Sequence, residues 1–393
     1  MKLIPTLTLT LASIGFFSTP FQFVVAEESK ELLLNQASAE TLSTSVAHKK
    51  RSITQELAVN YKTYGHHLKT QVNQYQLSVN LEKFIYLDKQ TDSNIRKLNQ
   101  GIRQLKGITQ HNTNIIDLRL ANANMLTQWQ AGQSPLFAYA PEGNDTQWTY
   151  IEAFDEAGNI HLLDAHVLPT RPVFIIELNG EQTLKEGIET MHSVFNAANV
   201  NLDKNILRTD FSTMVDEPLS TTVVKNIKLK NVEESWISGD AEVYAIVSGI
   251  SPENTDIAPQ LDILEFPYLD EADTNYSPNQ IVVQWENYRW QAVDIVLMEN
   301  DDNTNYKNLA SAILEAATAV LRLIPDPTVQ GYAIIPQLTN AIIQAMPDSW
   351  WTNDDDYLDV FYTIFENQTY TNHKGASNNA TVDLEPLTIQ PRG

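Results

Sequence analysis

Hydrophobic side chains in the first third of the chain recur at intervals of three and four positions. This spacing is typical of one buried face on a helix. The clearest series is Ile53, Leu57, Tyr61, Tyr64 and Leu68. The stretch from residue 27 to residue 130 contains no Pro and no β-branched run, and breaks are expected near Gly101 and Gly107. The pattern predicts a helical N-terminal part over residues 27–130.

The pattern changes at about residue 131, where short alternating runs replace the helical spacing. Residues 148–154 and 160–164 alternate around the turn sequence at 155–159, which predicts a β-hairpin. The apolar run at 173–176 predicts a buried strand, and residues 184–198 return to helical spacing. We therefore expect a small mixed α/β region over residues 131–219.

From residue 220 to residue 393 the chain reads as a series of half-buried strands. Apolar and polar residues alternate around residues 227–230, 241–247, 281–285 and 358–364, with turn-forming residues between them. Two amphipathic helices interrupt the series, one from Tyr306 and one opened by Pro336. The fold class expected is α+β, with a C-terminal antiparallel β-sandwich that carries two inserted helices.

The first 26 residues have the pattern of a secretory signal peptide. Lys2 gives the positive start, residues 3–17 are apolar, and small residues end at Ala26. We expect export to the periplasm or the exterior, and no further stretch is long enough for a membrane span. The chain has no Cys, so disulfides and thiolate chemistry are excluded.

The formal charge of −23 is unevenly distributed. Residues 27–130 hold 13 Lys and Arg against 9 Asp and Glu, whereas residues 231–393 hold 5 against 26. Nucleic-acid binding is excluded as a function because it requires clustered cations. The acidic half is either a solvated surface or a concentration of cation ligands, and the basic helical part could dock on it.

Carboxylates and amides gather directly after the apolar run 293–298. Asp301, Asn303 and Asn305 repeat the first half of a calcium loop, in which oxygens at alternate positions converge on one ion. Tyr306 stands where such a loop requires Gly, so the segment is not an EF-hand. We expect Asp354 and Asp356, from a second acidic loop, to complete a calcium site with these three residues.

Two other interpretations of the same acidic segment stay open. Acidic residues before a helix interact favourably with its dipole, and Thr304 or Asn305 can cap the free amides. Alternatively, the carboxylates belong to an acid–base active site. No zinc helix, nucleophile elbow, phosphate loop or dinucleotide fingerprint accompanies them, so enzyme activity is left undecided.

Aromatic residues suggest a further class of function. Five of the seven Trp lie in the C-terminal part, and the adjacent pair Trp350 and Trp351 could stack on sugar rings. Core packing is the competing interpretation. A carbohydrate or a protein is therefore a candidate ligand.

Four segments of the C-terminal half resemble a family of exported bacterial proteins of unknown function. They are residues 236–244 (WISGDAEVY), 298–306 (MENDDNTNY), 351–357 (WTNDDDY) and 375–380 (GASNNA). The resemblance implies an exported protein with these acidic loops and transfers no catalytic residue. Together with the charge pattern it suggests a calcium-stabilised binding or interaction domain. A secreted hydrolase or carbohydrate-binding module is the alternative.

Overall fold

The computed structural model describes ten ranges of the chain, all of which belong to the unit Ser45–Gly393. These ranges are 45–83, 87–143, 145–202, 217–231, 235–239, 241–252, 257–300, 302–324, 330–346 and 357–391. The expected signal peptide at residues 1–26 lies outside them. No helix within these ranges is long and apolar enough to cross a membrane.

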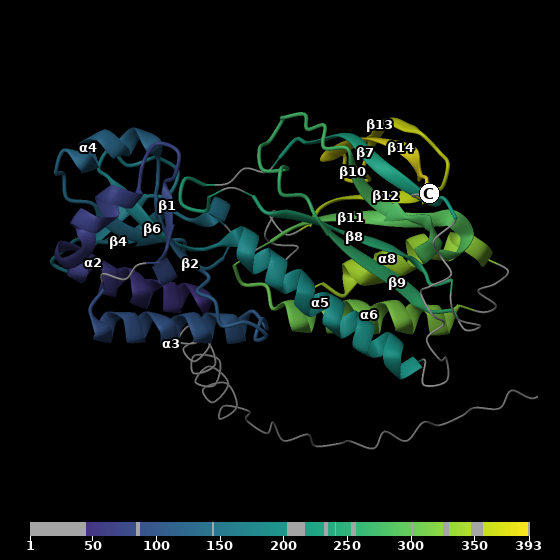
Figure 1. Cartoon of the computed structure of the whole chain (residues 1–393), viewed down its shortest axis with the longest axis horizontal. Coiled ribbons are helices and arrows are strands. Elements are labelled where there is room, and N and C mark those ends of the chain that lie inside the picture. Colours follow the sequence, from purple (N-terminus) through teal and green to yellow (C-terminus); the bar gives the residue numbers. More distant parts are fainter. Residues whose placement is uncertain are drawn as a thin grey trace, which may run out of the picture. The chain divides into compact units, whose positions relative to one another are not determined.

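Six strands form a sheet in the N-terminal half, in the order β1-β2-β6-β3-β4-β5 (Figure 1). Their bounds are β1 Ser78–Asn80, β2 Ile116–Leu120, β3 Leu136–Tyr139, β4 Tyr150–Phe154, β5 Ile160–Asp164 and β6 Val173–Leu178. β3 and β6 run parallel, and the other neighbours are antiparallel. The predicted hairpin at 148–164 is thus β4 and β5.

Three helices accompany this sheet: α2 Val46–Gln71, α3 Lys89–Leu105 and α4 Leu126–Gln130. α2 begins where the Ser45 hydroxyl accepts a hydrogen bond from the His48 amide, as an N-cap does. The helical series noted in the sequence is buried along α2, which contacts β3, β4 and β6. The first helix therefore completes the core of the sheet.

The region over 27–130 is less helical than its pattern predicts. Two of its segments, β1 and β2, are strands of the sheet. The break expected at Gly101 is absent because α3 continues to Leu105, and Gly107 then turns the chain with a φ of +71°. β2 is only five residues long, but Ile116, Leu118 and Leu120 alternate with Asp117 and Arg119, so the spacing of a strand is present in its sequence.

The C-terminal half contains two four-stranded sheets, preceded by helix α5 (Gly180–Leu202). One sheet has the order β10-β7-β14-β13 and the other β12-β11-β8-β9. Their bounds are β7 Leu219–Leu229, β8 Val243–Ile250, β9 Pro259–Glu265, β10 Gln280–Gln284, β11 Ala292–Glu299, β12 Tyr357–Phe365, β13 Tyr370–Lys374 and β14 Ala380–Ile389. Every pairing in both sheets is antiparallel.

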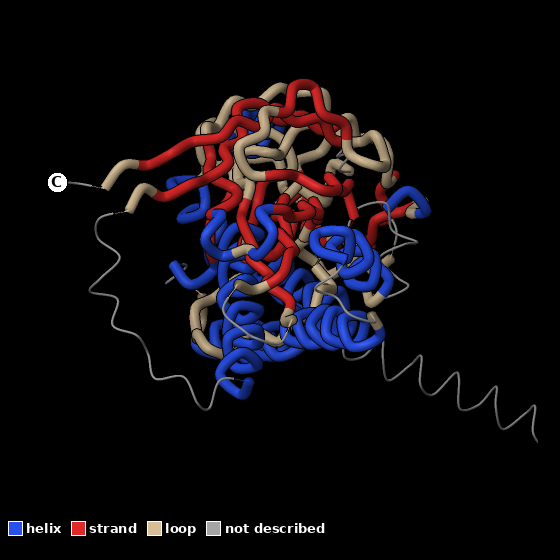
Figure 2. The backbone as a smooth tube through the Cα atoms, turned by 90° about the vertical axis from the view of Figure 1, so that its right-hand side faces the viewer, coloured by secondary structure: helices blue, strands red, loops and turns tan. Residues whose placement is uncertain are grey.

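The two sheets share one apolar core, and the second sheet has a further core on its other face. β8 and β11 are buried at all eight of their positions because they contribute to both cores. The outer face of that sheet is covered by α8 (Ile335–Gln344), while α6 (Tyr306–Leu323) contacts α8, α5 and β9. Figure 2 shows these helices gathered below the strands. The α+β class and the sandwich with two added helices are confirmed.

Candidate functional site

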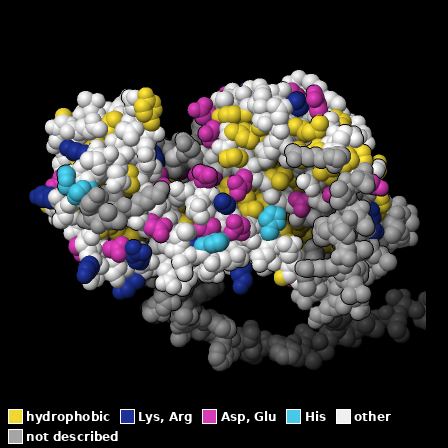
Figure 3. Space-filling model, in the orientation of Figure 1, with side chains coloured by type: hydrophobic (Ala, Val, Ile, Leu, Met, Phe, Trp, Pro, Cys, Tyr) yellow, Lys and Arg dark blue, Asp and Glu magenta, His cyan; other side chains and the backbone are white. Residues whose placement is uncertain are grey.

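A small pocket lies where loops of the C-terminal half meet the first sheet. Its volume is about 100 Å³. We call it the acidic pocket, because its charged lining residues are one Lys and five carboxylates. The lining residues are Ala47, Lys50, Ala140, Pro141, Gly143, Asp145, Trp148, Glu177, Leu178, Gly180, Ile237, Ser238, Glu242, Glu299, Asn300, Asp302 and Asn303. Acidic side chains are also prominent in the middle of the face shown in Figure 3.

Two of the four segments that carry the family resemblance meet in the acidic pocket. Segment 236–244 contributes Ile237, Ser238 and Glu242, and segment 298–306 contributes Glu299, Asn300, Asp302 and Asn303. The backbone joins the two segments, since the Asn300 amide donates to the Glu242 carbonyl over 3.0 Å. Residues some sixty positions apart in the sequence thus form one wall of the pocket.

Asp302 connects this wall to the first two helices. Its carboxylate pairs with the ammonium of Lys50, which is 2% exposed on α2. Its carbonyl accepts a hydrogen bond of 2.9 Å from Lys106, the residue that caps α3. Burial alone would raise the pKa of Asp302, but the two ammonium groups outweigh burial and hold that pKa below its usual value. The carboxylate is therefore charged and held in place.

Tyr306 fixes the other end of the same segment. Its amide donates to the Lys106 carbonyl over 3.0 Å, and the Lys106 ammonium lies 5.3 Å from its ring centroid. Its hydroxyl donates to the side chain of Asn300. The ring packs on α5 at Gly187, where a Cβ would lie 2.4 Å from ring carbons. The segment is clamped between α3 and α5.

Glu177 is a lining carboxyl whose pKa is strongly raised. It lies on β6 and accepts a hydrogen bond of 2.5 Å from the Arg119 guanidinium, which also donates to the Ile237 carbonyl. Burial raises the pKa of Glu177 to about 7, with Arg119 offsetting part of the effect and Asp117 adding to it. Glu177 can therefore gain or lose a proton near neutral pH.

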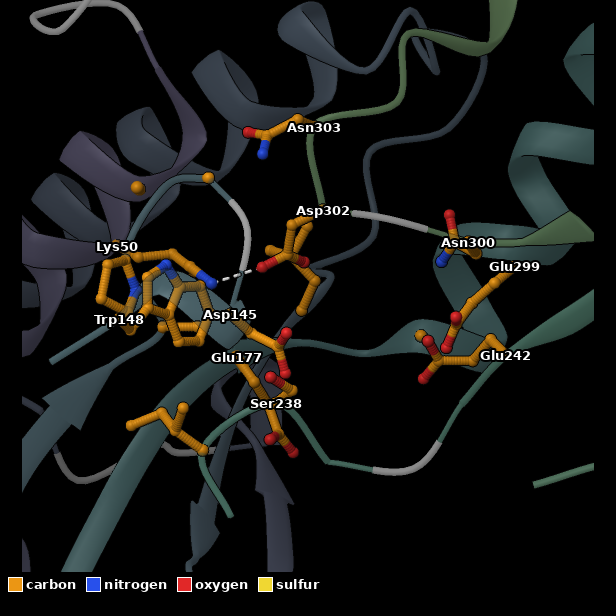
Figure 4. A pocket seen from close by; sticks show the side chains of 17 residues that line it. Lys50, Asp145, Trp148, Glu177, Ser238, Glu242, Glu299, Asn300, Asp302 and Asn303 are labelled. Atoms are coloured by element: carbon orange, nitrogen blue, oxygen red, sulfur yellow. Dashed lines mark hydrogen bonds and ion pairs between the residues drawn. The ribbon is translucent and has the colours of Figure 1, made fainter. Parts of the chain in front are cut away.

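Glu242 and Glu299 lie side by side on the far side of the pocket from Lys50 (Figure 4). Glu299 is 5% exposed at the end of β11. Glu242 approaches the first residue of α5 so closely that a Cβ on Gly180 would lie 1.6 Å from its Oε1. A side chain at position 180 would displace this carboxylate.

The residues expected to bind calcium are only partly within the described ranges. Asp301, Asp354 and Asp356 lie outside them. Asn303 lines the acidic pocket. Asn305 is the N-cap of α6: its Oδ1 accepts from the Asn308 amide over 3.0 Å, and its Nδ2 donates to the Leu105 carbonyl. Helix capping therefore accounts for Asn305 without a metal.

A further acidic loop, which contains Asp270 and Asp273, and the candidate Trp pair do not contribute to the acidic pocket within the described residues. Asp270 accepts a hydrogen bond from the Tyr276 hydroxyl and Asp273 pairs with Lys228, and neither lines the acidic pocket. The pair Trp350 and Trp351 lies outside the described ranges. Within those ranges no group of three or more His, Asp or Glu side chains is arranged to hold a metal.

A comparison with protein families matches most of the chain to one of them. The model of a family described as a protein of unknown function, DUF3103, matches residues 50–392. The chain belongs to the DUF3103 family. No curated protein and no solved structure matches it. The family carries no reaction, and the matched region begins at Lys50, one of the residues that line the acidic pocket.

The sequence of this DUF3103 protein indicated the acidic segment but not the other residues of the acidic pocket. Lys50 carried a usable signal, because it interrupts the apolar face of α2 between Val46 and Ile53. A charge on a buried face requires a buried partner. The identity of that partner, Asp302, could not be read from the sequence because 252 positions separate the two residues. Glu177 and Trp148 carried no local signal at all.

Proposed function

We propose that this DUF3103 protein binds a small, positively charged ligand in the acidic pocket. The observation that carries the proposal is the charge of the lining: five carboxylates face one ammonium group. Arg119 and Lys106 hydrogen-bond to Glu177 and Asp302, and with both included the carboxylates among the described residues still outnumber the cationic groups by five to three. Confined charges of one sign repel, and a bound cation relieves that repulsion.

Calcium is the first ligand to consider. The wall formed by Glu242, Glu299, Asn300 and Asn303 offers carboxylate and amide oxygens, which calcium prefers. An organic ammonium group is the other ligand of the same charge, since Trp148 also lines the pocket and an indole ring attracts cations. With either ligand, the proposed function of this protein is binding.

Isothermal titration calorimetry tests the proposal and separates the two ligands. The full chain is titrated with calcium, magnesium and 1,4-diaminobutane. We expect one of them to bind with a Kd on the order of 0.1–1 mM, the range of weak extracellular calcium sites. Glu242→Gln and Glu299→Gln should each weaken that binding about tenfold, which corresponds to about 1.4 kcal/mol.

Glu286→Gln is the matched control. Glu286 is exposed and does not line the pocket, so its replacement removes the same charge elsewhere. Binding by this variant should equal that of the parent. Absence of heat with all three ligands, or equal affinities in the parent and in the two pocket variants, would refute the proposal.

A hydrolase is the second candidate function. It is supported by Glu177, because a carboxyl with a pKa of about 7 in a pocket is suited to general acid–base work.

Export is likewise proposed, on the basis of the signal pattern at residues 1–26. The mass of the mature chain from its native host would reveal cleavage after Ala26.

A further inference from the structure

A second cavity lies beside α3, away from the acidic pocket, and has a volume of about 310 Å³. We call it the α3 pocket. Every residue that lines it is polar: Glu82, Arg96, Asn99, Gln100, Arg103, Gln104, Thr109, His111, Asn112 and Asn114. Known small-molecule sites begin at about 300 Å³ but are mostly apolar. The wholly polar lining therefore restricts the chemistry of a ligand.

Two buried side chains that line the α3 pocket, those of Asn99 and Arg103, bind the neighbouring loop. Asn99 is 6% exposed, and its amide donates to the Thr113 carbonyl and accepts from the Ile115 amide. Arg103 is 3% exposed, donates to the same Thr113 carbonyl and pairs with Glu186. The loop that closes the cavity is thus fixed to α3 before any ligand arrives.

The basic side chains of the α3 pocket already contact carboxylates within the protein. Arg103 pairs with Glu186, and Arg96 pairs with Asp92 over 2.9 Å. The His111 ring contacts Glu189 over 2.9 Å. An anionic ligand would have to compete with three carboxylates for these groups, so the lining does not favour an anion.

The uncharged side chains at the rim of the α3 pocket can form hydrogen bonds with a ligand. Gln100, Gln104 and Asn112 are exposed, and their side chains form no hydrogen bond with other parts of the chain that the structure describes. Each amide both donates and accepts. Hydroxyl groups also donate and accept, so several of them on one molecule match such a rim.

We propose that the α3 pocket binds a neutral polyhydroxylated ligand, that is, a saccharide. The site is distinct from the acidic pocket and does not depend on the proposed cation binding. No aromatic side chain lines the cavity. Because stacking on an aromatic ring is missing, the affinity for one sugar unit should be weak, with a Kd of about 1 mM.

Saturation-transfer NMR on the full chain tests the assignment. The probes are glucose, N-acetylglucosamine and maltotriose, each at 5 mM, with acetate and methyl phosphate as anionic probes. We expect transfer to at least one sugar and none to either anion. The double substitution Gln104→Ala with Asn112→Ala should reduce sugar binding at least fivefold, because it removes two free amides from the rim.

Gln110→Ala is the matched control, since Gln110 is exposed on the same loop but does not line the cavity. It should bind sugar as the parent does. Both variants alter exposed side chains, and equal melting temperatures would establish that they fold. The proposal is wrong if no sugar shows transfer, if only the anions do, or if the double variant binds sugar like the parent.

Discussion

Asp359 shows how much a single buried carboxylate can organise in this fold. It lies on β12 with no exposed surface, and its oxygens accept four backbone hydrogen bonds of 2.7–2.8 Å. The donors are the amides of Val360, Ser377, Asn379 and Ala380. Three of the four belong to segment 375–380, one of the segments that carry the family resemblance. This segment therefore has a structural role, because it fixes the β13–β14 turn of one sheet onto a strand of the other.

Asp359→Asn should destabilise the fold by about 3 kcal/mol or more. One oxygen is replaced by an NH₂ group, which leaves two backbone amides, one of them buried, facing a donor. Bonds to a charged acceptor contribute about 1.5–3 kcal/mol each. Urea unfolding gives the free energy. Asp273→Asn is the control, because it alters an exposed pair with Lys228 that is worth at most about 1 kcal/mol. Equal unfolding free energies for the two variants would contradict this role.

The sequence predicted Asp359 as part of a strand but did not indicate its burial or its donors. Single residues are predictable where the cause is local, as for Asn305, whose cap satisfies an amide three positions away. Asp359 is satisfied by amides up to 21 positions distant. Its role depends on how the two sheets pack against each other, and that packing has no local signal in the sequence.

At the scale of elements, the sequence predicted best those whose signal is periodic and bounded. α6 begins at Tyr306 and α8 has Pro336 in its first turn, both as expected, because apolar spacing and helix-start chemistry agree there. β2 was missed although its apolar residues alternate with Asp117 and Arg119, because this short signal lies inside a long region read as helical. β4 and β5 are equally short and were predicted, because a turn sequence at 155–159 lies between them.

β5 is an edge strand of the first sheet and shows a second feature that only the fold reveals. The Ala165 amide donates a hydrogen bond to the Thr149 carbonyl on the β4 side. Backbone groups alternate in direction along an antiparallel strand, so the amides and carbonyls of Asp164, Leu162 and Ile160 face away from β4. The indole of Trp236 donates to the outward Asp164 carbonyl over 3.2 Å. Trp236 thus covers one end of an edge on which Ile160 and Leu162 are 55% and 67% exposed.

Trp236→Ala should promote self-association. It frees the Asp164 carbonyl and lengthens an exposed apolar edge, which is a template for pairing with another chain. Sedimentation velocity between about 5 and 100 μM would detect a concentration-dependent dimer that the parent lacks. Trp236→Phe keeps most of the apolar cover and should remain closer to the parent. A monomeric Trp236→Ala variant at all concentrations would show that the edge does not need this cover.

At the scale of the whole molecule, the charge asymmetry of the sequence has a structural counterpart. Lys50 and Lys106, from the basic first part of the chain, both contact Asp302 in the acidic second part. The sequence suggested that the two parts could dock, and it could not indicate where. One of the contacts between the two parts lies at the acidic pocket, so a change in the charge of that pocket should alter the free energy of unfolding of the entire fold.

The last prediction couples the proposed cation binding to pH through Glu177. Because the pKa of Glu177 is raised to about 7, its carboxyl is mostly protonated at pH 5.5 and mostly ionised at pH 8.5. Protonation removes one negative charge from the pocket, so the cation should bind more weakly at the lower pH. At a Kd of about 0.1 mM, 10 mM calcium should add about 2.7 kcal/mol to the unfolding free energy at pH 8.5. Coupling between the proton and the ion should reduce that increment by about 1 kcal/mol or more at pH 5.5.

Urea unfolding with chelator and with 10 mM calcium, at both pH values, measures the two increments. In Glu177→Gln the side chain is neutral at both pH values. The increase in unfolding free energy that calcium causes in this variant should therefore be nearly the same at pH 5.5 and pH 8.5. Comparing increments within each protein removes any direct effect of the substitution on stability. Equal increments for the parent at the two pH values would show that Glu177 is not the coupled proton site. A parent with no increment at either pH would instead argue against calcium as the ligand of the acidic pocket.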